Sequence, residues 1–190
     1  LNHRLGQNMR VLISGASGLV GTEVARQLRQ DGHEPLRLVR RAAKAADEVS
    51  WNPAKGEIDS QIMETVDAVV NLAGATTGRI PWTAKYKKEI VASRLDSTRT
   101  LVTAINRAGN PPKVLISGSA SGFYGEGGSN WLSEDSPKGK GFLSDLANSW
   151  EQEAMKARAR VVLVRTTLVM SRKKGALGPL MPLLKLGVGG

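Results

Sequence analysis

The stretch Arg10-Val-Leu-Ile-Ser-Gly-Ala-Ser-Gly-Leu-Val-Gly21 decides the fold. Residues 11–14 predict a short apolar strand, and Gly15, Gly18 and Gly21 follow it at regular spacing. Apolar residues then recur at intervals of three and four, which is typical of a helix. A strand, a glycine turn and a helix in this order predict a turn that binds a dinucleotide. The alternative is a tight strand-to-helix turn without a ligand.

Each glycine has a separate role in such a turn. Gly15 permits the tight turn, Gly18 lets the backbone approach a pyrophosphate, and Gly21 lets the helix pack closely on the strand. The free backbone N–H groups at the start of the helix would hold the phosphates. The residues that we expect to bind the cofactor here are Gly15, Ala16, Ser17, Gly18, Leu19, Val20 and Gly21.

Composition excludes several classes of protein. The chain has 190 residues, 41% of them hydrophobic and 23% charged, which suits one globular domain with a core. It contains no cysteine, so disulfides, thiolate chemistry and cysteine zinc sites are excluded. No apolar run reaches the ~20 residues that span a bilayer, and residues 1–9 do not resemble a secretion signal. We expect a cytoplasmic protein with no metal site and no membrane partner.

The net charge of +10 raises the question of nucleic-acid binding. The basic residues are scattered, however, and aromatic residues make up only 4% of the chain, so no stacking platform for single strands is evident. A basic surface also suits anionic cofactors and substrates. We therefore expect a small-molecule substrate and no nucleic acid, with nucleic-acid binding as the less favoured alternative.

Strand and helix patterns alternate along the chain. This alternation predicts an α/β fold, a Rossmann-type doubly wound parallel sheet with helices on both faces. The expected strands are 10–14, 34–39, 49–51, 67–73, 113–116 and 161–169. The expected helices are 19–30, 83–108 and 143–157, and a long Gly- and Ser-rich loop is expected over 118–141.

Both ends of the chain differ in character from its middle. Residues 1–9 look like a linker or the remnant of an upstream segment, and 10–172 make up the predicted NAD(P)-binding domain. Residues 173–190 mix Gly, Pro and Leu, and their leucines have nothing downstream to cover them. We interpret this last stretch as the start of a truncated substrate-binding region, so that the C-terminal substrate lobe would be missing from this chain.

Arg40 and Arg41 follow the second predicted strand. An acidic residue at the end of this strand would bind the ribose hydroxyls of NAD, whereas arginine suits the 2′-phosphate of NADP. These two arginines therefore favour NADP over NAD as the cofactor. The alternative is a basic turn that faces solvent.

Two further motifs lie at predicted strand ends. Asn71-Leu-Ala-Gly74 leaves room for the adenosine half of a ligand, so we expect Leu72, Ala73 and Gly74 to contact the cofactor. The stretch Ser117-Gly-Ser-Ala-Ser-Gly-Phe-Tyr-Gly125 has hydroxyls where a nicotinamide and a substrate carbonyl would lie, and Ser117 is expected at the cofactor. A simple strand-to-loop turn and a flexible serine turn are the respective alternatives.

These motifs together resemble the extended branch of the short-chain dehydrogenase/reductase superfamily, the NAD-dependent epimerase/dehydratase family. Its atypical subgroup of sugar-nucleotide-epimerase-like proteins, some of which carry a SulA-like label, is more similar still. Four shorter stretches add to the likeness: Arg79-Ile-Pro-Trp82, Ser93-Arg94, Trp150-Glu151 and Val164-Arg-Thr166. The resemblance covers about residues 10–190 and implies a possible homodimer that pairs helices 83–108 and 143–157.

One departure from the superfamily bears on activity. The superfamily's catalytic Tyr-x-x-x-Lys pair is missing, because Phe142 and Leu146, or Leu143 and Ala147, stand at its position. Ser119 matches the family's catalytic hydroxyl and Tyr124 is the only nearby phenol, so these two residues are the expected catalytic groups. Two functions stay open: an NAD(P)-binding, epimerase-like oxidoreductase of unknown substrate, or a non-catalytic NADP(H) sensor or scaffold.

Overall fold

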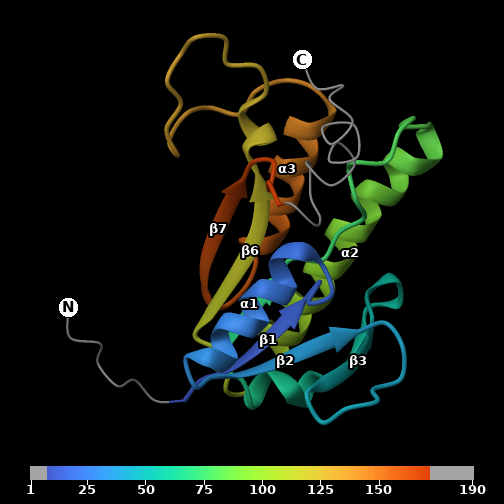
Figure 1. Ribbon diagram of the computed structural model, residues 1–190, viewed down its shortest axis with the longest axis vertical. Helices are drawn as coiled ribbons and strands as arrows, with labels where there is room; N and C mark the ends of the chain where they lie inside the picture. Colours follow the sequence, from blue (N-terminus) through green and yellow to red (C-terminus); the bar gives the residue numbers. More distant parts are fainter. Residues whose placement is uncertain (1–7, 172–190) are drawn as a thin grey trace, which may run out of the picture.

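The computed structural model describes residues 8–171, and its centre is a seven-stranded sheet in the order β4-β3-β2-β1-β5-β6-β7 (Figure 1). All neighbouring strands are parallel except β3 and β4. Without the edge strand β4, this is the strand order of a doubly wound dinucleotide-binding sheet. The predicted α/β fold is confirmed. The strands are β1 (Arg10–Ser14), β2 (Glu34–Val39), β3 (Glu48–Asn52), β4 (Glu57–Ile58), β5 (Ala68–Asn71), β6 (Val114–Ala120) and β7 (Arg160–Thr166).

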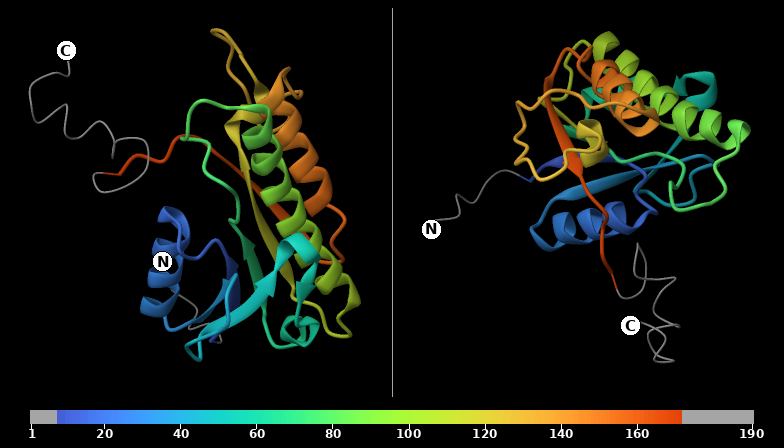
Figure 2. Two further views of the ribbon diagram at one scale, coloured as in Figure 1. Left: turned by 90° about the vertical axis from the view of Figure 1, so that its right-hand side faces the viewer. Right: turned by 90° about the horizontal axis from the view of Figure 1, so that it is seen from above.

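Helices cover both faces of this sheet. Helix α1 (Leu19–Gln30) lies on one face, while α2 (Ala84–Arg107) and α3 (Phe142–Ala154) lie side by side on the other (Figure 2). Short 3₁₀ turns occupy η1 (Pro53–Lys55), η2 (Ser60–Glu64) and η3 (Ser121–Tyr124). The three predicted helices are therefore confirmed: α1 has the predicted ends, and the ends of α2 and α3 differ by one to three residues.

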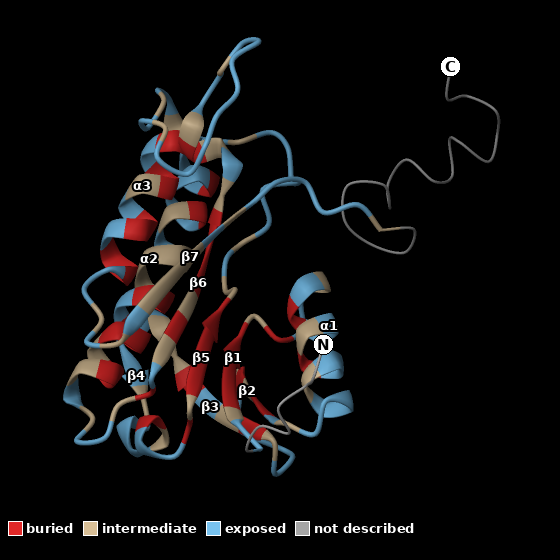
Figure 3. Cartoon of the chain, turned by 90° about the vertical axis from the view of Figure 1, so that its left-hand side faces the viewer, coloured by how far each residue is buried: buried red, intermediate tan, exposed pale blue. Residues whose placement is uncertain are grey.

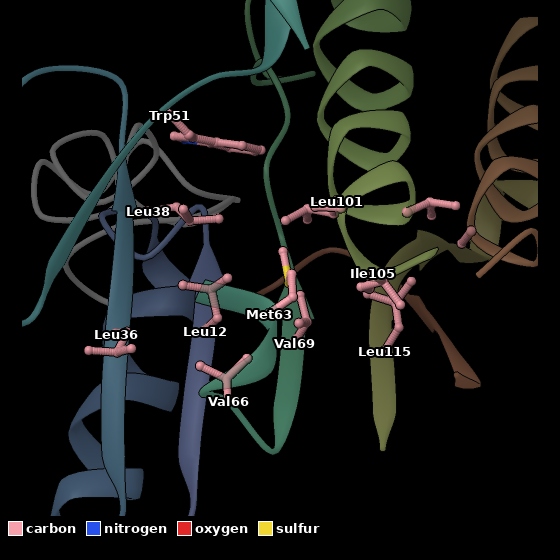
Figure 4. Packing of buried hydrophobic residues seen from close by; sticks show 13 residues of the cluster. Leu12, Leu36, Leu38, Trp51, Met63, Val66, Val69, Leu101, Ile105 and Leu115 are labelled. Atoms are coloured by element: carbon pink, nitrogen blue, oxygen red, sulfur yellow. The ribbon is translucent and has the colours of Figure 1, made fainter. Parts of the chain in front are cut away.

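Successive side chains of β1 point to opposite faces of the sheet and so contribute to the hydrophobic core on both faces. Val11 and Ile13 pack with Ala25 of α1, whereas Leu12 joins the larger cluster on the α2 side. In that cluster Leu12 and its neighbours on β5 and β6 pack with α2 residues such as Leu101 (Figure 4). The central strands are consequently buried on both faces, as a parallel sheet requires (Figure 3).

The edge of the sheet beyond β2 differs from the prediction. The predicted short strand at 49–51 is present as β3, but it continues into a small antiparallel hairpin, with Trp51 paired to Ile58 and Asn52 to Glu57. Two-residue strands such as β4 are too short to give an alternating pattern, so the sequence carried no signal for it.

The strand β6 is longer than predicted. It runs to Ala120, because β7 offers a pairing partner along its whole length, up to Ala120 beside Thr166. The predicted loop over 118–141 is therefore wrong at its start, and its next four residues form η3. Glycine and serine have low strand propensity, and here strand pairing outweighs it. Ser117 and Ser119 thus lie on a strand.

The predicted segments at the two ends fall mostly outside the described residues, which exclude 1–7 and 172–190. Among residues 8–171, no helix has the length and apolar character needed to cross a membrane. The same part of the chain contains no cluster of acidic or histidine side chains suited to a metal ion.

Candidate functional site

The glycine turn after β1 is tightly packed against its neighbours. Gly15 has a positive φ of 70°, and a Cβ there would lie 2.6 Å from the carbonyl oxygen of Leu72. A Cβ on Gly21 would overlap the carbonyl oxygen of Gly15. Gly18 is different, because its nearest neighbour would be the Gly15 oxygen at 3.2 Å. Gly15 and Gly21 are thus required by the fold, whereas Gly18 is exposed and a Cβ there would need only a small shift of the turn.

The N-terminus of α1 has no side chain to cap it. Gly18 occupies the N-cap position, no side chain bonds to the first-turn N–H groups, and the first turn contains no acidic residue. The first N–H groups of a helix have no partner within the helix and carry partial positive charge. This end of α1 therefore fits a phosphate, and residues 15–21 surround it.

Ser14 joins the turn to the loop after β5. Its hydroxyl donates to Asn71 Oδ1 at 2.7 Å and accepts from the backbone N–H groups of Leu72 at 3.1 Å and Ala73 at 3.2 Å. Residues 72–74 therefore lie at the carboxyl edge between β1 and β5, where the strand order reverses. Ligands of doubly wound sheets bind at this reversal.

A buried polar network lies directly behind this edge. The Asn71 amide donates to Thr98 Oγ1 at 2.8 Å and is 3.5 Å from Ser117 Oγ. Thr98 Oγ1 also accepts from Trp150 Nε1 at 2.9 Å. Ser117 is fully buried, so its hydroxyl belongs to this network. Its predicted place at the cofactor stays a prediction.

The two arginines after β2 have different surroundings. Arg41 donates to both carboxylate oxygens of Glu48, each at 2.7 Å, and the backbone N–H of Lys44 donates to the same carboxylate. These bonds hold the pKa of Glu48 down at about 2, with the Arg41 bond the largest cause. Within residues 8–171, the exposed Arg40 side chain has no ion-pair or hydrogen-bond partner. Only Arg40 is therefore available to a phosphate without breaking an existing pair.

Ser119 is bound to an acidic residue of α3. Its hydroxyl donates to Glu151 Oε1 at 2.5 Å, and both residues are buried. Arg165 of β7 donates to both oxygens of Glu151 at 2.8 Å. Burial raises the pKa of Glu151, but the bonds from Arg165 and Ser119 outweigh it, so this pKa lies below the usual 4.5. Glu151 is therefore a weak base that orients Ser119 without activating it.

Tyr124 lies on the other side of Arg165. Its hydroxyl oxygen accepts from Arg165 Nη1 at 2.8 Å, which leaves the phenolic proton free to donate elsewhere. The guanidinium also lies 3.6 Å from the ring centroid of Phe123 and donates to the carbonyl oxygen of Glu134. The half-buried Arg165 thus connects the two predicted catalytic hydroxyls, Tyr124 directly and Ser119 through Glu151.

The positions of the missing Tyr-x-x-x-Lys pair are apolar in the structure as well. Leu143 is 42% exposed at the start of α3 and Ala147 is buried one turn later. Phe142 packs edge-on against Trp82, and Leu146 is buried in the same cluster. None of these side chains transfers a proton.

Sequence reasoning assigned no role to Glu151 or Arg165. Both occur in stretches that carried the family resemblance, Trp150-Glu151 and Val164-Arg-Thr166, but their pairing joins residues 14 positions apart on different elements. The available signal was the position of Glu151 on the buried face of α3, next to Trp150 and one turn after Ala147.

We predict that Glu151→Gln destabilises the protein by about 1.5–3 kcal/mol at neutral pH, because it weakens the charged hydrogen bonds that the half-buried Arg165 makes to this side chain. The folded-state pKa of Glu151 is lowered, so its stabilisation is complete above pH 4.5 and is lost as the pH falls through the folded value. Below pH 4.5 the parent should therefore lose stability more steeply than the variant. Urea unfolding across this range measures both effects.

Glu23→Gln is the matched control. Glu23 pairs with Arg26 on the surface, and the two side chains are 51% and 49% exposed. Its loss should leave stability almost unchanged, because exposed ion pairs contribute little. Parallel pH curves for the parent and Glu151→Gln would contradict the structural role of the buried pair.

The chain is similar to known proteins over almost its whole length. The family described as NAD dependent epimerase/dehydratase family matches residues 11–178. An epimerase family protein of Mycobacterium tuberculosis is 39% identical over 185 residues, which are 96% of this chain and 61% of the relative. Human epimerase family protein SDR39U1 is 34% identical over 189 residues, 96% of this chain and 62% of the relative. The chain spans less than two thirds of these relatives.

Solved structures of epimerases and epimerase family proteins are also similar to this chain. The human SDR39U1 crystal structure with NADPH superposes with a TM-score of 0.84 and 33% identity, over 96% of this chain and 61% of that one. A nucleoside-diphosphate sugar epimerase from Corynebacterium glutamicum gives a TM-score of 0.82 and 31% identity, over 97% of this chain and 38% of that one. With the glycine turn, the strand order and the sequence match in agreement, the chain belongs to the NAD-dependent epimerase/dehydratase family.

Proposed function

We propose that this chain binds NADP(H) as the cofactor domain of an epimerase-like oxidoreductase, and that the substrate of this enzyme is a nucleotide sugar. The observation that carries the proposal is the uncapped N-terminus of α1 behind Gly18, at the point where the strand order reverses. The structure of human SDR39U1 with NADPH and the name of the Corynebacterium glutamicum relative support it. Within the family, this proposal assigns the chain to the sugar-nucleotide-epimerase-like subgroup.

The residues present fit a dinucleotide. The backbone of residues 15–21 would hold the pyrophosphate, and Leu72, Ala73 and Gly74 would lie beside the adenosine half. Arg40 would bind the 2′-phosphate, while Arg41 would position the loop through Glu48. When bound, the nicotinamide would supply a hydride acceptor or donor.

Tyr124 is the proposed proton-transfer residue, and Ser119 the proposed substrate-orienting hydroxyl. Arg165 holds the oxygen of Tyr124 and leaves its proton unused by residues 8–171. Ser119 is 4% exposed and its proton is directed to Glu151, so it offers a substrate only its lone pairs. This arrangement supplies weaker acid–base catalysis than a Tyr–Lys pair.

A second candidate function is a non-catalytic NADP(H) sensor. The apolar side chains of Leu143 and Ala147, at the positions of the catalytic pair, favour it. Both functions use the same cofactor site, so only a measurement of substrate turnover distinguishes the enzyme from the sensor. A homodimer through α2 and α3 stays a prediction under either function.

Gly18→Val should weaken NADPH binding by at least about tenfold while the protein stays folded, because the valine side chain occupies the approach to the pyrophosphate. The 3.2 Å separation from the Gly15 oxygen requires only a small adjustment of the turn. Titration of NADPH with parallel thermal unfolding measures both. Gln27→Val, exposed on the same helix, is the control. Unchanged NADPH affinity in the folded Gly18→Val protein would refute the dinucleotide site.

Cofactor preference should depend on Arg40 more than on Arg41. Loss of a charged hydrogen bond of about 1.5–3 kcal/mol predicts that Arg40→Ala reduces the preference for NADP over NAD roughly ten- to a hundredfold. Arg41→Ala should instead lower thermal stability and weaken both cofactors together. The affinities of each variant for NAD and NADP test this. Equal affinities of the parent for the two cofactors would contradict the assignment.

Turnover by the full-length protein should be slow or absent with UDP- and GDP-sugars, since no Tyr–Lys pair is present. Steady-state rates with NADP, measured for the parent, Ser119→Ala and Tyr124→Phe, decide between enzyme and sensor. Fast turnover that either substitution abolishes would support the enzyme. Fast turnover that survives both would show that other residues are catalytic.

A further inference from the structure

Arg94 of α2 points at the loop that follows β5. Its Nη1 donates to the carbonyl oxygens of Ala75 at 3.1 Å and Ile90 at 3.0 Å, and its Cζ lies 5.3 Å from the Trp150 ring centroid. A Cβ on Gly74 would be only 3.0 Å from this Cζ. The guanidinium is therefore fixed directly against Gly74, at the carboxyl edge of the sheet.

This guanidinium lacks a counter-ion in the part of the chain that the structure describes. Arg165, Arg37 and Arg41 all pair with carboxylates, but no carboxylate of residues 8–171 lies within 4.0 Å of Arg94. Arg94 is half-buried, and this desolvation lowers its pKa. Removing a cation from water without a counter-ion costs free energy, which two carbonyl dipoles offset only in part.

One edge of the guanidinium, formed by Nε and Nη2, remains for a ligand. Nη1 makes both bonds to carbonyl groups, while Nε and Nη2 have no hydrogen-bond partner among residues 8–171. No buried side-chain nitrogen in that range lacks a partner, so these donors reach the protein surface. Adjacent N–H groups on one planar fork match the two oxygens of a carboxylate or phosphate.

We propose that Arg94 binds an oxyanion, a phosphate or carboxylate, on the ligand that lies at the carboxyl end of β5. This rests on the proposed function, which places a ligand at that edge. The α1 N-terminus and Arg40 already provide for the phosphates of the cofactor. The anion at Arg94 therefore belongs to the second ligand, so the substrate carries an acidic group beside Gly74 and Ala75.

The test uses inorganic phosphate as the probe and tryptophan fluorescence as the signal, because Trp150 contacts the guanidinium. Phosphate should bind the NADP-saturated parent, and Arg94→Met should weaken this binding roughly ten- to a hundredfold. Arg94→Lys should retain part of it, which guards against a fold defect in the methionine variant. Arg99→Met, an exposed cation on the same helix, should match the parent.

A cofactor origin of the anion would give a different result. Phosphate would then compete with NADP, and Arg94→Met would weaken NADP itself. Unchanged binding of both phosphate and NADP in folded Arg94→Met would overturn the proposal and leave Arg94 a packing residue. Failure of the dinucleotide site alone is distinguishable, because phosphate binding without cofactor would still depend on Arg94 and not on Gly18.

Discussion

The buried side chain of Asn71 fixes the strands and helices around the site to one another. Its oxygen accepts from Ser14 of β1, and its nitrogen donates to Thr98 of α2, which in turn accepts from Trp150 of α3. One amide at the end of β5 thus connects a neighbouring strand and both helices of one face. Every polar side-chain atom buried within residues 8–171 has a hydrogen-bond partner, so the network carries no desolvation penalty that is left uncompensated.

Four arginines around the site fall into two groups according to the partners of their guanidinium groups. Arg165 and Arg41 are saturated by carboxylates and hold a helix or a loop in place. Arg40 and Arg94 have no such partner among the described residues and lie at or near the edge that we propose binds ligands. The arginines that we propose for ligand binding are thus ones that can bind an anion without breaking an existing ion pair.

Local patterns sufficed for the fold. Strand, turn and helix signals near Gly15, Gly18 and Gly21 are encoded within a dozen consecutive residues, and the alternation of elements determined the sheet type. The hairpin of β3 and β4 and the full length of β6 were missed because strand pairing, not local propensity, creates them.

The site was less accessible to sequence reasoning for the same reason. Ser119 and Tyr124 were identifiable as hydroxyls at a strand end, but their partners Glu151 and Arg165 come from other elements. Which arginine after β2 is free of Glu48 also depends on a pairing that no spacing rule contains. The sequence showed which types of residue are present, but not which of them form hydrogen bonds with one another.

The strand order also has a consequence for folding while the chain is being synthesised. β1, the earliest strand of the described chain, is central, and its partner β5 follows 57 residues later, Val11 beside Ala68. At about 5–20 residues per second, a ribosome needs several seconds to supply that partner. Meanwhile β1, α1 and β2 present an open apolar strand edge and an uncovered sheet face. During this interval nascent chains of this fold expose an unpaired strand edge through which they can associate with one another.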